Sequence, residues 1–384
     1  MSRPLYRLSV REKLKELIQM RSVTPPGEVA DVAAALCQFA AALGAKAVLQ
    51  EVEPGKPNCL ITFDFGPGRT LVFNSHMDVN NPQGQRWSFD PFSPFEADGR
   101  IYGLGACDAK GSLAAMLAAF ERVAAAPDGV RGKVYFTVVM GEEAGGLGSR
   151  FLAEQGLRGD AGVVGEPTEL RVCTAHKGTY MRRLVFHGRA AHSASSHLGI
   201  NAICHAAQFC VLYQKLDAAL RQLPHPILGP ANASVTVIQG GTRQNTIPES
   251  CSLIIDRRLL PGETSEKADL ELEAVLQELQ ALCPEARADW ETIVSTVPSQ
   301  TGSGEEIVSA ALRAADTIAG PGHAPAGFNA GCDMSKLVNI AGIPTVILGP
   351  GSLKNAHSPD EFVDCGQLEQ AVGIYEEIIR SYLK

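Results

Sequence analysis

The run of residues 133–140 limits the folds open to this chain more than any other segment. It is rich in β-branched and aromatic residues, is apolar on both faces, and stops abruptly at Gly141. Strands that are apolar on both faces belong to sheets that helices cover on each side. The run therefore predicts the central strand of a mainly parallel sheet in an α/β fold.

Other segments of the first half alternate between strand-like and helical patterns. Residues 71–73 and 161–164 are short apolar runs, and residues 112–126 are rich in Ala and Leu without Gly or Pro, which favours a helix. Such alternation is typical of α/β domains. In their sheets, ligands bind at the loops that follow the carboxyl ends of the strands.

The pattern changes at about residue 178. Six segments follow in the order strand, helix, strand, strand, helix, strand, namely residues 179–187, 201–220, 233–238, 251–257, 264–282 and 286–293. That order is the split arrangement of a ferredoxin-like α+β domain. Because the α/β pattern then resumes, we expect a discontinuous domain of residues 1–177 and 294–384, with residues 178–293 inserted into it.

Length and composition restrict the class of protein. A chain of 384 residues exceeds the usual size of one hydrophobic core, which favours two domains. With 34 Lys and Arg against 42 Asp and Glu, the net charge is −8 and no basic block occurs, which argues against a nucleic-acid partner. The sequence shows no signal peptide and no run of about 18 apolar residues, so we expect no membrane association. Ten scattered cysteines without a CxxC pair indicate reduced thiols and a cytoplasmic location.

Residues of the types that bind metals follow the predicted strands at five places. Each has an ordinary alternative, such as a surface pair, a helix cap or a solvated loop. Together, two imidazoles and several carboxylates suit a pair of divalent ions, with Zn²⁺ expected first and Co²⁺ as an alternative, and such ions activate water. Thiols are absent from the set unless Cys107 contributes. The candidates are His76 with Asp78, Asp108 in a Gly-rich turn, the pair Glu142 and Glu143, Glu166, and His357.

These residues, in this order, resemble those of the M20 family of metallopeptidases and deacylases. The resemblance extends from about residue 65 to residue 363 and includes the segments Gly-Glu-Pro-Thr (165–168), Ala-Ala-His-Ser-Ala (190–194) and Asn-Thr-Ile-Pro-Glu (245–249). It implies a catalytic metal-binding domain and an inserted lid domain that also forms a homodimer.

The resemblance also implies a role for each candidate residue. His76 and Glu166 would bind one metal, Glu143 and His357 the other, and Asp108 would bridge the two. Glu142 would be the general base, and Asp78 would orient His76. These implied roles are those that metal chemistry needs, because a carboxylate beside a metal site can shuttle protons near neutral pH.

In the inserted domain, the resemblance makes His192 a residue that reaches the partner's active site and stabilises the oxyanion. Asn245 and Arg258 would hold the substrate carboxylate, a task for which the planar guanidinium is suited. Without the resemblance, His192 would be a surface histidine, and Arg258 would belong to an ordinary strand-edge pair.

The implied activity is removal of an N-acyl group, expected to be acetyl, from a small amino acid such as N-acetylornithine. The alternatives within the family are a desuccinylase and a dipeptidase or glutamyl-carboxypeptidase. A catalytically inactive member that binds small molecules is the alternative that is not an enzyme. Asn80, Asn81 and the loop of residues 327–333 depart from the family pattern, so we expect them to line an altered substrate pocket.

Overall fold

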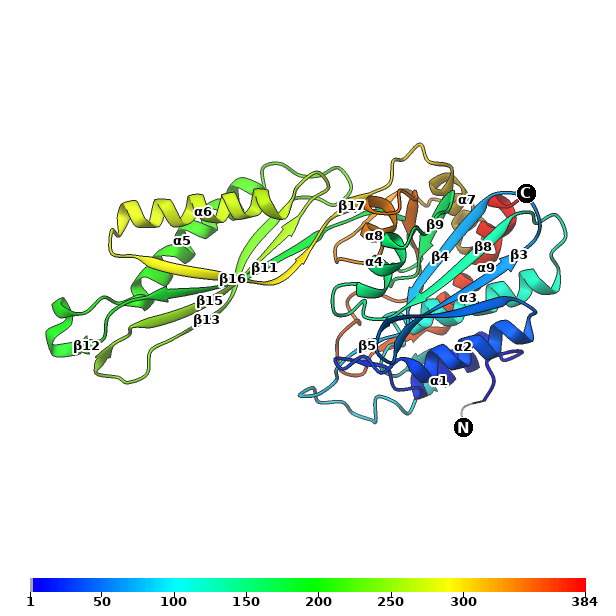
Figure 1. The fold of residues 1–384 in the computed structure, drawn as a ribbon, viewed down its shortest axis with the longest axis horizontal. Coiled ribbons are helices and arrows are strands. Elements are labelled where there is room, and N and C mark those ends of the chain that lie inside the picture. Colours follow the sequence, from blue (N-terminus) through cyan, green and yellow to red (C-terminus); the bar gives the residue numbers. More distant parts are fainter. Residues whose placement is uncertain (1–2) are drawn as a thin grey trace. The chain divides into compact units, whose positions relative to one another are not determined.

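The computed structural model describes residues 3–384 and divides the chain into two compact units (Figure 1). Unit 1 runs up to Ala175 and also contains Gln300–Phe328 and Cys332–Lys384. Unit 2 contains His176–Ser299 and Asn329–Gly331. Each unit is built around its own cluster of buried hydrophobic side chains.

Unit 1 is built on a nine-stranded sheet whose centre is parallel. The strand order is β17-β10-β19-β9-β4-β8-β3-β2, and β18 pairs with β10. The pairs β19–β9, β9–β4 and β4–β8 are parallel, whereas β3 and β2 add antiparallel strands at one edge. The strands are β2 (Lys46–Glu53), β3 (Lys56–Asp64), β4 (Thr70–His76), β8 (Lys133–Val139), β9 (Ala161–Val164), β10 (Cys173–His176), β17 (Ser299–Gln300), β18 (Ala326–Phe328) and β19 (Thr345–Ile347).

Strand β8, which the sequence predicts at the centre of the sheet, lies between β4 and β3. Apart from Lys133 and Tyr135, which are half-buried, every residue of β8 is buried. The register pairs His76 with Val139, so β4 and β8 end side by side. The turns after these strands therefore begin at the same edge of the sheet, and the mainly parallel α/β prediction is confirmed.

Helices pack around this sheet (Figure 1). The Ala-rich α3 is buried along most of its length because its small side chains allow close packing against α9 and β4. The helices of unit 1 are α1 (Val10–Gln19), α2 (Ala30–Ala42), α3 (Lys110–Ala125), α4 (Leu147–Glu154), α7 (Glu306–Ala319), α8 (Met334–Asn339) and α9 (Cys365–Tyr382). Five short strands form two small sheets, namely β1 (Val23–Thr24) with β5 (Val79–Asn80), and β20 (Phe362–Asp364) with β7 (Arg100–Tyr102) and β6 (Phe95–Ala97).

Unit 2 is an antiparallel sheet with the order β13-β15-β11-β16, and α5 and α6 pack against it. Burial alternates along β15, so one face of the sheet meets the helices. The elements are β11 (Gly178–His187), α5 (Ala202–Leu220), β13 (Asn232–Gly240), β15 (Ser250–Leu259), α6 (Ser265–Leu282) and β16 (Arg287–Thr296), in the predicted order. A short ribbon of β12 (Ala191–His192) and β14 (Thr246–Ile247) and a 3-10 helix (Ser193–Leu198) complete the unit.

All ten cysteines are free thiols in the structure. Among residues 3–384, no helix has both the length and the apolar character that a bilayer span requires.

Candidate metal centre

His76 is the last residue of β4 and is buried, with an exposed fraction of 1%. Its Nδ1 lies 2.9 Å from the backbone oxygen of Asp78. A carbonyl oxygen can only accept, so Nδ1 carries a proton, and in the neutral ring Nε2 is then the nitrogen that presents its lone pair. Nε2 points to the carboxylates, 3.2 Å from Asp108 Oδ1 and 4.0 Å from Glu166 Oε1. The backbone thus fixes the tautomer that can bind a metal through Nε2.

Asp78 positions the turn after β8. Its Oδ1 accepts the Glu142 N–H at 3.2 Å, and its Oδ2 accepts the Glu143 N–H at 3.3 Å. Oδ1 also lies 3.6 Å from His76 Nδ1. Asp78 is completely buried, so one carboxylate ties the ends of β4 and β8 together.

Five of the predicted residues form two clusters that share Asp108. One ligand atom from each of His76, Asp108 and Glu166 lies within 4.8 Å of the others, and the same holds for Asp108, Glu143 and His357. In the second cluster, His357 Nε2 lies 3.3 Å from Asp108 Oδ2 and 3.0 Å from Glu143 Oε2. Asp108 therefore turns one carboxylate oxygen toward each cluster.

The buried carboxylates of the two clusters need a positive charge nearby to stay ionised. Burial raises the pKa values of the Glu142 and Glu166 carboxyl groups well above the usual range for glutamate. Burial also raises the pKa of the Glu143 carboxyl group. Hydrogen bonding to Asp108 and Glu143 raises the pKa of His357 to about 11. Glu143 Oε1 is buried without a hydrogen-bond partner. An unpaired buried carboxylate oxygen is costly, and a divalent cation would satisfy it.

The donor types fit borderline divalent ions such as Zn²⁺, which accept imidazole nitrogen and carboxylate oxygen. Cys107 does not join the set, because its Sγ donates to the Ser352 carbonyl at 3.2 Å. Burial also raises the pKa of this thiol well above its usual range, which disfavours the thiolate that a metal would need.

Glu361 is a residue of this site that the sequence analysis did not single out. Its Oε1 accepts the N–H groups of Cys107 and Asp108 at 2.7 and 3.0 Å, and its Oε2 accepts that of Gly105 at 2.9 Å. The carboxylate thereby shapes the turn that carries Asp108. Only its place four residues after His357 could have pointed to it.

A buried ion pair at the start of α8 lies next to Gly146, in the turn that carries Glu142. Asp333 and Lys336 are 1% and 6% exposed, and the distance from Lys336 Nζ to Asp333 Oδ1 is 3.5 Å. Gly146 has a φ of 76°, and a Cβ at Gly146 would overlap Lys336 Nζ and lie 2.6 Å from Asp333 Oδ1. The turn can pack against the ion pair only because residue 146 is glycine, which has no Cβ and adopts a positive φ without strain.

The three remaining predicted residues belong to unit 2. His192 and Asn245 are neighbours, since the N–H of Ser193 donates to the Asn245 carbonyl at 2.9 Å, and both are exposed. Arg258 lies near the end of β15, where Asp256 binds its guanidinium at 2.9 and 3.0 Å. Arg258 lies eight positions after Ser250 in β15, which is about 26 Å of extended chain at ~3.3 Å per residue. The structure thus does not bring Asn245 and Arg258 together within one subunit.

The fold and these clusters define a class. A parallel sheet whose strand ends gather two histidines and several carboxylates, with a further glutamate beside them, is the arrangement of a hydrolase that uses a pair of metal ions. The chain matches the peptidase family M20/M25/M40 over residues 72–381 and belongs to this family.

The relatives agree with this assignment. The chain is 30% identical to the acetylornithine deacetylase of Vibrio vulnificus over 90% of each chain, and 28% identical to that of Proteus mirabilis over 86% of this chain and 85% of the other. Its fold is similar to that of an M20 family metallo-carboxypeptidase from Sulfolobus solfataricus, with a TM-score of 0.81 and 21% identity over 98% and 99% of the two chains. It is also similar to the Bacillus subtilis YXEP protein, a dinuclear metal-binding peptidase, with a TM-score of 0.72 and 18% identity over 97% and 98%.

Proposed function

We propose that this chain is a dinuclear zinc amidohydrolase that removes an N-acyl group, acetyl first, from a small amino acid such as N-acetylornithine. The observation that carries the proposal is the pair of three-residue clusters joined at Asp108, with Glu142 on the adjoining turn. His76 and Glu166 would hold one ion, Glu143 and His357 the other, and Asp108 both. Co²⁺ is an alternative to Zn²⁺ at these positions.

Glu142 is the general base of this proposal. Its backbone N–H is fixed by Asp78, and within residues 3–384 its carboxylate makes no hydrogen bond or ion pair. It is therefore free to take a proton from water and to pass that proton to the departing amine. When bound, the two ions would polarise the amide carbonyl and lower the pKa of water.

The separation of the polar residues in unit 2 supports a homodimeric site. Arg258 and Asn245 cannot both contact one substrate carboxylate within a single subunit, because the length of β15 lies between them. In a dimer, the two residues would come from different subunits, and His192 would reach the partner's active site through the lid. The exposed side chain of His192 would then stabilise the oxyanion.

The relatives from Vibrio vulnificus, Vibrio parahaemolyticus and Proteus mirabilis favour deacetylation over the alternatives, since they are named acetylornithine deacetylases. The solved structures similar in fold include peptidases, so dipeptide or glutamyl-amide cleavage is the second candidate. The cytoplasmic location stays a prediction of the sequence.

The test is a hydrolysis screen on the purified full chain loaded with Zn²⁺ or Co²⁺. The panel holds N-acetylornithine, other N-acetyl amino acids, N-succinyl-diaminopimelate, dipeptides and glutamyl amides, each with and without a chelator. We expect chelator-sensitive release of acetate. Cleavage confined to peptides would replace the deacetylase proposal with the peptidase one, and no cleavage by a protein with two bound ions would refute both.

Glu142→Gln is the matched variant for the mechanism, because it removes the base and keeps the shape of the side chain. Turnover should fall by at least about 10²-fold while the metal content stays at two ions per chain. Loss of one ion in this variant would mean that Glu142 is a ligand and that the assigned roles are wrong.

A further inference from the structure

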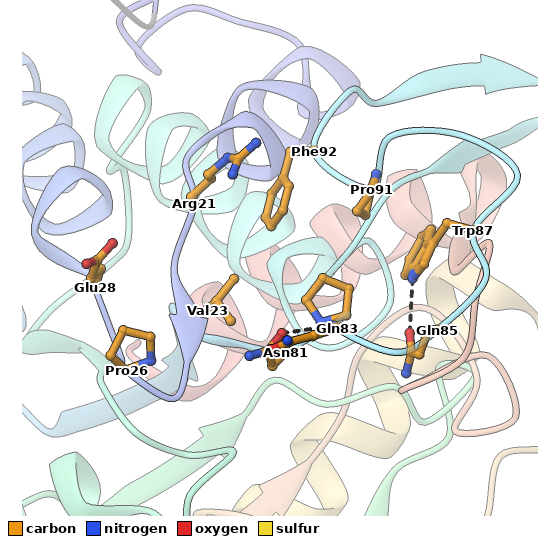
Figure 2. A pocket seen from close by; sticks show the side chains of 11 residues that line it. Arg21, Val23, Pro26, Glu28, Asn81, Gln83, Gln85, Trp87, Pro91 and Phe92 are labelled. Carbon is orange, nitrogen blue, oxygen red and sulfur yellow. Dashed lines mark hydrogen bonds between the residues drawn. The ribbon is translucent and has the colours of Figure 1, made fainter.

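A cavity of unit 1 is lined by loops that are hydrogen-bonded to the metal centre. Its volume is about 540 Å³, and three segments line it, residues 21–28, 81–87 and 91–92. Figure 2 shows the side chains that line it. A volume of this size is in the range of small-molecule sites.

The wall of the cavity is hydrogen-bonded to the metal centre on two sides. Strand β1 at its rim pairs with β5, where Asn80 donates to Glu143 Oε2 at 2.9 Å. Gln85, which lines the cavity, donates to the His357 carbonyl at 3.2 Å. Glu143 and His357 are the two residues that, with Asp108, form the second candidate metal position. A ligand that moved residues 80–85 would therefore act on that position.

The cavity carries two opposite charges at one side. Figure 2 places Arg21 and Glu28 on one side and Gln85 and Trp87 on the other. Within residues 3–384, neither Arg21 nor Glu28 takes part in an ion pair or a side-chain hydrogen bond. The Arg21 guanidinium carbon stacks 4.5 Å from the centroid of the Phe92 ring, which orients the group and leaves its N–H edge free.

Besides the polar side chains of Asn81 and Gln83, the rest of the lining is apolar or held by a hydrogen bond. Phe92, Pro82 and Pro91 supply apolar surface, and the Trp87 indole is fixed by its donation to Gln85 Oε1 at 3.0 Å. A ligand with one anionic group, one cationic group and an apolar body matches this arrangement of charges and apolar surface.

We propose that this cavity binds a free α-amino acid with an apolar side chain, separately from the metal centre. The carboxylate pairs with Arg21, the ammonium group pairs with Glu28, and the side chain extends over Phe92 toward Trp87. Binding is coupled to the second metal position through Asn80 and Gln85. Because coupling between two sites is reciprocal, the amino acid changes zinc affinity by the same factor by which zinc changes the affinity for the amino acid.

The first experiment measures binding of L-leucine by calorimetry to the full chain after the metal has been removed. Metal removal matters, because an amino acid can also bind directly to zinc. We expect saturable binding of one leucine per chain, weaker binding of isocaproate, which lacks the ammonium group, and at least a tenfold loss of leucine affinity in Arg21→Met and in Glu28→Gln. Arg86→Met is the matched control, because Arg86 is exposed in the same loop and its side chain has no partner within residues 3–384.

The second experiment titrates zinc into the protein with and without leucine. The affinity of one of the two zinc positions should change several-fold in the wild type and in Arg86→Met, and should not change in Arg21→Met. Arg21→Met should bind two zinc ions per chain and unfold at the same urea concentration as the wild type in the absence of leucine, and this shows that the variant folds.

Leucine binding that appears only in the zinc-loaded protein and survives Arg21→Met would overturn the proposal and place the amino acid on the metals. Absence of leucine binding to both forms would also overturn it. Neither result depends on hydrolysis, so failure of this proposal is distinguishable from failure of the deacetylase assignment.

Discussion

Replacement of Asp78 by Asn should weaken one metal position and spare the other. The Asp78 carboxylate uses Oδ1 for the Glu142 N–H and for its approach to His76 Nδ1, and it uses Oδ2 for the Glu143 N–H alone. An amide has one acceptor oxygen, and its NH₂ repels the other N–H donors. The side chain introduced by Asp78→Asn therefore keeps its oxygen on the Oδ1 side and gives up the bond to Glu143.

The magnitude follows from the bond that is lost. A hydrogen bond to a charged group contributes about 1.5–3 kcal/mol, and Asp78 is completely buried. At 1.4 kcal/mol for each factor of ten, the position formed by Asp108, Glu143 and His357 should bind zinc roughly 10- to 150-fold more weakly. The position of His76 and Glu166 should change little, because the His76 ring is still held by the backbone oxygen of residue 78.

The assay is a calorimetric titration of metal-free protein with Zn²⁺, repeated with Co²⁺, whose absorption reports each position. Asp128→Asn is the control, because Asp128 is exposed and its side chain has no partner within residues 3–384. Equal weakening of both positions would show that Asp78 acts mainly through His76. Unchanged binding at both positions would refute the role of the carboxylate in positioning the turn.

Three further changes test other parts of the structure. Glu361→Gln leaves one acceptor oxygen for the three N–H groups that the two carboxylate oxygens accept, so at least one bond that shapes the Asp108 turn is lost. Because Asp108 serves both clusters, zinc affinity should fall at least about tenfold at both positions in the same titration. Gly146→Ala should lower the free energy of unfolding by ~1–3 kcal/mol and reduce kcat, because Gly146 has a positive φ and the added Cβ would collide with the Asp333–Lys336 pair. Unchanged kcat would mean that the pair does not position Glu142. Arg257→Met leaves Glu263 and Glu271 without the buried guanidinium that lies 2.7 and 3.2 Å away, and should lower the free energy of unfolding of unit 2 by about 3–5 kcal/mol. The measurement is urea unfolding in a Trp87→Phe background, where Trp290 is the one remaining tryptophan and reports on unit 2.

Much of the fold follows from local patterns in the sequence. Residues 133–140 are apolar on both faces, so they require cover on both sides, and β8 lies between β3 and β4. The order of elements in unit 2 follows in the same way from alternation along β15 and from the helical run that becomes α6. Such patterns are readable because a residue's neighbours within a few positions determine the faces of a strand or helix.

The sequence also determined which residues could meet at the metal centre. His76 ends β4, whereas Glu142 and Glu166 follow β8 and β9, and the carboxyl ends of parallel strands lie at the same edge of a sheet. That geometric rule is independent of the distance along the chain, so residue types at strand ends were enough to predict which side chains lie together.

The tertiary structure alone decided how these residues are held and what lies next to them. Glu361 bonds to the Asp108 N–H across 253 positions of the chain, and the Asp333–Lys336 pair supports the Glu142 turn from another helix. The cavity of unit 1 combines Arg21 with Phe92 and Gln85, which no local pattern relates. Contacts of this kind depend on how complete elements pack, because a buried charge or a lined cavity exists only once distant segments have removed it from water.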